Sequence, residues 1–67
     1  MNLYQFHFVD AAGVVTHRHS LKLPTNEAAI KLGQRMFAGR DCDWAVEVWY
    51  LNRLVHTETR PRVAARG

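Results

Sequence analysis

The sequence has a single cysteine, Cys42, among its 67 residues, so no internal disulfide can form. Asp41 and Asp43 flank this cysteine. Cationic neighbours lower the pKa of a thiol, and these acidic neighbours therefore predict an ordinary thiol rather than a reactive one. A chain without disulfides is typical of a reducing compartment, and we expect the cytoplasm.

Long apolar runs are also absent. No stretch approaches the roughly 18 apolar residues that a membrane-spanning helix needs, and the opening MNLYQFHFVD has no basic region followed by an apolar one. We therefore expect neither a membrane span nor an export signal. The net charge of +3 owes much to Arg60, Arg62 and Arg66, so the folded part is expected to be close to neutral.

Residues that carry catalysis or bind cofactors do not form recognisable motifs. The only serine is Ser20, and the sequence has neither a glycine-rich phosphate loop nor a G-x-S-x-G element. Glu47 and Glu58 are expected on the same open sheet face, where they would form a carboxylate pair. A domain with one thin core offers no deep pocket to raise the pKa of such a pair, so we predict no enzyme and no small-molecule substrate.

The histidines do not predict a metal site. His17 and His19 would point the same way on a strand, with His7 on the adjacent strand. Zinc needs three or four converging ligands, and the expected strand registers do not supply them. We predict no metal and no cofactor.

Alternating apolar residues and turn signals predict the fold. Aromatic residues at positions 4, 6 and 8 alternate with other side chains, which is the period of a half-buried strand. Asp10 to Gly13 is a turn signal, and Pro24 stops the second strand. Strands are expected over residues 3–9, 14–17 (or as far as 20), 44–51 and 54–59.

One helix is marked at both ends. Thr25 is a good N-cap, Glu27 suits the positive end of the helix dipole, and Gly39 is a natural C′ residue, which predicts a helix over about 26–38. Gly33 lies at the centre of the apolar stripe, where it would let the helix approach the sheet closely. The prediction is an α+β fold, ββαββ, with an antiparallel four-stranded sheet and one helix packed on one face. Residues 1–60 would form the single domain, and residues 61–67 a disordered basic tail.

The last hairpin places the candidate binding residues. A two-residue turn at Asn52 and Arg53 would set Trp49 opposite His56 and Leu51 opposite Leu54 on the face away from the helix. Large exposed apolar patches are uncommon on monomers, and tryptophan is enriched in binding hot spots. The predicted protein-binding residues are Trp49, Leu51, Leu54, His56, Glu47 and His7, with Leu3 and Val9 as further exposed apolar residues.

Several short motifs resemble a family of short bacterial domains of unknown function. They are LYQFHFVD at residues 3–10, LP at 23–24, EAA at 27–29 and VEV at 46–48. Members of that family begin with an aromatic-rich strand and have a Leu-Pro element before an Ala-rich helix; the resemblance implies a fold and no assigned activity. This chain differs at HRHS, residues 17–20, where the family tends to be acidic and to place a glycine. Size and element order are also similar to those of small anti-CRISPR proteins.

The leading hypothesis is a non-catalytic protein-interaction module that binds itself or a larger protein through the open sheet face. The anti-CRISPR likeness implies steric inhibition of a nucleic-acid-processing complex, and contact is favoured over DNA mimicry because a mimic should be acidic. The alternatives are a structural homodimer and a nucleic-acid-binding module. The latter would use Lys31, Arg35, Arg53, Arg60, Arg62 and Arg66.

Overall fold

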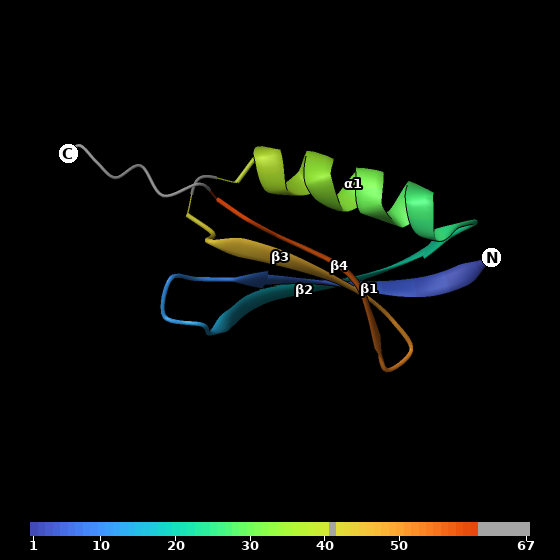
Figure 1. Ribbon diagram of the computed structural model, residues 1–67, viewed down its shortest axis with the longest axis horizontal. Coiled ribbons are helices and arrows are strands. Elements are labelled where there is room, and N and C mark those ends of the chain that lie inside the picture. The colour runs from blue at the N-terminus through green and yellow to red at the C-terminus, as the bar shows by residue number, and fades with distance from the viewer. Residues whose placement is uncertain (41, 61–67) are drawn as a thin grey trace.

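Two β-hairpins flank a single helix in the computed structural model, which describes residues 1–40 and 42–60 (Figure 1). The predicted α+β fold, ββαββ with one antiparallel four-stranded sheet, is confirmed. The predicted tail over residues 61–67 lies outside the described residues, as does Asp41. The elements are β1 (Asn2–Val9), β2 (Val15–Leu23), α1 (Asn26–Ala38), β3 (Ala45–Tyr50) and β4 (Arg53–Thr59).

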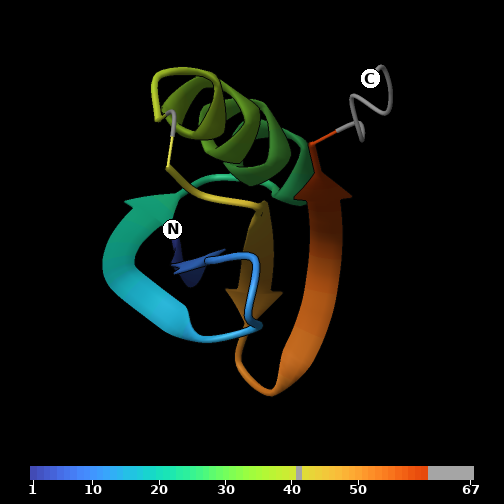
Figure 2. The same cartoon turned by 90° about the vertical axis from the view of Figure 1, so that its left-hand side faces the viewer.

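The sheet has the strand order β2-β1-β3-β4, with β1 pairing antiparallel to both β2 and β3 (Figure 2). The first turn forms where predicted: the Asp10 carboxylate accepts hydrogen bonds from the N–H groups of Ala12 and Val14, and Gly13 takes a φ of 85°. Strand β2 extends to Leu23, further than the sequence indicated. It stops there because the next residue, Pro24, has no N–H to donate to the ladder.

The core lies between α1 and one face of the sheet. Strand β1 contributes Tyr4, Phe6 and Phe8, and β3 contributes Val46 and Val48, all fully buried. These side chains occupy alternate positions, as the period-2 pattern predicted. The helix α1 packs on one face of the sheet (Figure 1). Because successive residues of a strand point to opposite faces, the residues between these core positions face away from the helix.

Close approach of the helix depends on Gly33. A Cβ atom at this position would lie 3.0 Å from Cγ2 of Val48 and 3.4 Å from Cε2 of Phe6, which is too close for unstrained packing. The helix begins as predicted, with Thr25 Oγ1 accepting the Ala28 N–H at 3.1 Å. It ends at Gly39 with a φ of −87°, so this glycine does not use the left-handed conformation expected of a C′ residue.

The second hairpin differs from the prediction. Its turn residues are Leu51 and Asn52 rather than Asn52 and Arg53, so Tyr50 pairs with Arg53 and Trp49 with Leu54. Leu51 takes a φ of 58°, a conformation that glycine and asparagine adopt more readily.

A register shift follows within β3 and β4, and His56 pairs with Val48 on the helix side of the sheet. The extra residue is Val55, which packs against the core.

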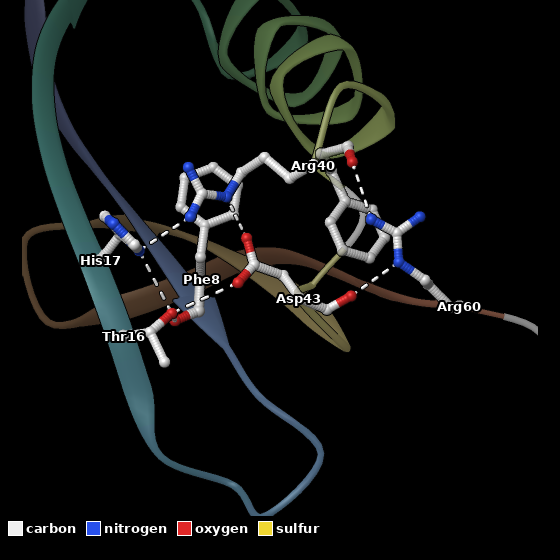
Figure 3. Close-up of polar contacts among 7 residues, drawn as sticks. Phe8, Thr16, His17, Arg40, Asp43 and Arg60 are labelled. Atoms are coloured by element: carbon white, nitrogen blue, oxygen red, sulfur yellow. Dashed lines mark hydrogen bonds and ion pairs between the residues drawn. The ribbon is translucent and has the colours of Figure 1, made fainter.

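The loop between α1 and β3 is fixed by a buried carboxylate (Figure 3). Asp43 is 3% exposed; it forms an ion pair with the Arg40 guanidinium and accepts a hydrogen bond from the Thr16 hydroxyl at 3.3 Å. Arg40 also covers the Phe8 ring, with 4.8 Å between its guanidinium carbon and the ring centroid. Arg40 Nη2 also lies 2.8 Å from Nδ1 of His17 in β2, so Arg40 connects the loop to both strands of the first hairpin.

Gly33→Ala should destabilise the fold by about 1 kcal/mol. Crowding against buried Val48 costs about 1–3 kcal/mol and outweighs the gain of about 1 kcal/mol in helix propensity. Gly39→Ala is the matched control, because its Cβ would meet only the Met36 carbonyl oxygen at an ordinary 3.7 Å. Urea denaturation followed by circular dichroism measures both. A Gly33→Ala variant as stable as wild type would show that the helix tolerates a wider separation.

Asp43→Asn should destabilise the fold by about 2–3 kcal/mol, because it removes the charge that compensates Arg40 in a partly buried pair. Asp10→Asn is its control: asparagine can still accept the turn hydrogen bonds, so the change in unfolding free energy should stay below about 0.5 kcal/mol. Equal effects in chemical denaturation would contradict a special role for Asp43.

Candidate protein-interaction surface

A group of side chains on the sheet face away from α1 forms what we call the Trp49 surface. It comprises Leu3 and His7 of β1, Glu47 and Trp49 of β3, and Leu54 of β4. The strand pairings bring them together, since His7 lies opposite Glu47 and Trp49 lies opposite Leu54. The helix packs on the other face (Figure 2).

Trp49 is held in one orientation by its neighbours. Its indole Nε1 donates a hydrogen bond to Glu47 Oε1 at 3.1 Å, and its ring centroid lies 6.1 Å from that of His7. His7 Nδ1 in turn lies 4.0 Å from Glu47 Oε1. A tryptophan already oriented in this way loses little side-chain freedom when a partner covers it.

Apolar side chains flank this cluster. Leu3 is 48% exposed and Leu54 is 44% exposed, while Trp49 and His7 are half-buried. The mixture of an aromatic centre, apolar neighbours and one carboxylate is typical of an interaction surface rather than of a reaction centre. His7 Nε2 lies 3.2 Å from the side-chain oxygen of Gln5. The imidazole therefore has an amide as its neighbour and not a hydroxyl or thiol that it could activate as a nucleophile.

Sequence reasoning missed two cations beside this surface. Arg18 pairs with His7 and Lys22 pairs with Leu3, which places both cations on the open face of β2. The signal was present in the sequence: with Leu21 and Leu23 directed inward, the even-numbered residues of the strand must point outward.

Three predicted members of the surface lie elsewhere. Leu51 is a turn residue, 76% exposed at the hairpin tip, and not a strand residue opposite Leu54. His56 lies on the helix side because of the register shift. Val9 is buried rather than exposed, beside a bulge between β1 and β2.

The predicted carboxylate pair does not form, because the two glutamates occupy opposite faces. Glu47 pairs with Thr57 on the open face, whereas Glu58 pairs with Val46 on the helix side. Glu58 Oε1 lies 3.1 Å from His56 Nε2 and 3.1 Å from Gln34 Nε2. These hydrogen bonds, that from His56 foremost, favour the ionised form and lower the pKa of Glu58 below its ordinary value of 4.5.

The basic residues proposed for nucleic acid are not gathered on one surface. Arg60 donates to the backbone carbonyls of Asp43 and Phe37 and covers the Phe37 ring (Figure 3). Arg53 lies at the other end of β4, about 23 Å away at the usual rise of a strand.

The two predicted helix cations are exposed. Lys31 lies 3.8 Å from Glu27, one turn earlier, which offsets part of its charge. Arg35 is exposed in the last turn, whereas Arg62 and Arg66 lie outside the described residues.

A cavity of about 600 Å³ opens between the start of α1 and the tip of the second hairpin, lined by Asn26, Tyr50, Leu51, Asn52, Arg53 and Val55. None of the residues that line it belongs to the Trp49 surface. Within residues 1–40 and 42–60, no three histidine, cysteine or acidic side chains are close enough to hold a metal ion.

Comparison with protein-family models, curated proteins and solved structures gives no match, so the arrangement of residues is the only guide to function. In the part of the chain that the structure describes, no helix has the length and apolarity to cross a membrane.

The lowered pKa of Glu58 predicts a pH-dependent contribution to stability. A depressed folded-state pKa means that this contribution is present above about pH 4.5 and is lost as the pH falls through the folded-state value. Glu58→Gln should therefore be less stable than wild type near neutral pH, with the difference shrinking in acid. NMR titration of the Glu58 carboxyl carbon checks the pKa directly. A Glu58 midpoint at or above 4.5 would contradict the hydrogen-bonded arrangement.

Proposed function

We propose that the chain is a non-catalytic protein-interaction module that binds another protein through the Trp49 surface. The observation that carries this proposal is the oriented Trp49 side chain, held by Glu47 and His7 on a sheet face that α1 does not cover. Tryptophan side chains of this kind supply much of the free energy at protein interfaces.

The charges near the surface indicate the kind of partner. Arg18 and Lys22 lie on the β2 side of the open face, and Glu47 is engaged by the Trp49 indole. The fitting partner presents an apolar patch for Trp49, Leu3 and Leu54, with acidic residues at its rim. Such charges contribute more to the rate of association and to specificity than to affinity.

The arrangement gives less support to the nucleic-acid alternative, because Arg60 is occupied by backbone carbonyls and Lys31 lies beside Glu27. Inhibition of a nucleic-acid-processing complex, which the likeness to anti-CRISPR proteins implied, stays a prediction within the protein-binding proposal. The homodimer alternative is the case of this proposal in which the bound protein is a second copy of the chain.

Photo-crosslinking tests the proposal in cells that express the chain. A photoreactive amino acid replaces Leu3 or Leu54 on the Trp49 surface, and Arg35 on the exposed side of the helix as the control. We expect a discrete protein adduct from positions 3 and 54, its yield falling about 30-fold in Trp49→Ala as expected for the loss of about 2 kcal/mol of binding free energy. Equal adducts from position 35, or adducts that survive Trp49→Ala, would contradict the proposal.

Light scattering of the purified chain separates the two forms of the proposal. A dimer that becomes a monomer in Trp49→Ala would identify a second copy as the partner, whereas a monomer would leave a different protein. Circular dichroism of Trp49→Ala confirms that the variant folds.

A further inference from the structure

The outer edge of β2 is a second place where the fold is open. Strand β2 is nine residues long, β1 pairs with one of its edges, and residues 16–22 are all exposed. Among the described residues, no strand lies against its other edge. Alternate residues of an edge strand direct their N–H and C=O groups outward, so this edge offers a ladder to an added strand.

The charges on β2 have one sign. Arg18 and Lys22 project on the open face, His17 and His19 are on the other face, and the strand has no carboxylate. If a second copy of β2 paired with this edge, the Arg18 and Lys22 side chains of the two copies would lie beside one another. Like charges on adjacent strands are destabilising. An acidic strand would instead meet complementary charge.

We propose that the outer edge of β2 binds an extended acidic segment of another protein as a fifth strand of the sheet. Main-chain hydrogen bonds to β2 supply affinity, and the side chains on the two faces supply specificity. Arg18 and Lys22 also border the Trp49 surface, but the main-chain contacts are made by the edge of β2, and binding there does not require Trp49.

The spacing of the side chains defines the segment. Arg18 and Lys22 are four residues apart on one face, about 13 Å along a strand. Carboxylates at matching spacing in the added strand would lie beside them. The intervening residues of that strand would point to the helix side, where Leu21 is 40% exposed. The preferred segment therefore alternates acidic and apolar residues.

The probe is a fluorescein-labelled nine-residue peptide that alternates glutamate and valine, the length of β2. We expect saturable binding by fluorescence anisotropy, with slowed hydrogen exchange confined to amides of β2. Arg18→Gln combined with Lys22→Gln should weaken binding at least about tenfold, as expected for the loss of two charge-assisted contacts. Lys31→Gln combined with Arg35→Gln removes the same charge from the helix and should leave binding within about twofold.

A second peptide separates strand pairing from simple charge attraction. Methylating every second backbone nitrogen keeps every carboxylate and removes half of the N–H donors. One of the two possible patterns removes the donors that would face β2, and the other removes those that would face solvent. Loss of binding with only one of the two methylation patterns would support pairing as an added strand. Equal binding of the parent and both methylated peptides, or equal effects of the two glutamine pairs, would overturn it.

Two further results would also overturn the proposal. One is a single-stranded oligothymidine that displaces the peptide and protects the same amides, which would assign the edge to phosphate. The other is a concentration-dependent dimer that protects the same amides, which would assign it to a second copy. Trp49→Ala should bind the peptide like wild type, so failure here and failure of the Trp49 surface are distinguishable.

Discussion

The contact of Gly33 with Val48 and Phe6 sets the geometry of the whole molecule. A chain of this size can bury only one modest core, and here that core is the single layer between α1 and the sheet. With no Cβ at Gly33, the helix lies close enough to exclude water from the aromatic side chains of β1. Among the described residues α1 is the only helix, and it packs on one face of the sheet (Figure 1). The opposite face, which the strand pairing assigns to Trp49, is therefore not covered by a helix. Fold and candidate site are therefore two results of one packing arrangement.

Strong local signals made much of this structure predictable from the sequence. The alternation of Tyr4, Phe6 and Phe8 fixed which face of β1 is buried, and Thr25 and Gly39 marked the limits of the helix. The position of Trp49 followed from the same alternation in β3. The prediction for the second hairpin was wrong in two respects. Turn preference favoured Asn52 in the first turn position, whereas the turn residues are Leu51 and Asn52, and the bulge at Val55 was not predicted. One residue of register moved His56 to the other face of the sheet.

The misplaced residues show what local patterns cannot report. The contacts of Arg60 with the carbonyls of Phe37 and Asp43 join segments far apart in the chain, and nothing near Arg60 in the sequence indicates them. Arg18 and Lys22 were overlooked for a different reason: the run of polar residues in β2 resembles a loop, and only Leu21 and Leu23 at its end indicate which side chains point outward. Charged edge strands of this kind are difficult to recognise because they lack the apolar alternation that marks a strand.

The strand order has a consequence for when the Trp49 surface can exist. Each hairpin is local in sequence, but β1 and β3 pair across the entire first hairpin and helix. His7 and Trp49 meet only across that long-range pairing, whose loop-closure entropy opposes its formation until the core assembles. A nascent or partly unfolded chain with both hairpins formed would still lack the surface. Recognition at Trp49 would thus report completed folding, and a partner bound there would stabilise the one strand pair that the chain forms with the greatest entropic cost.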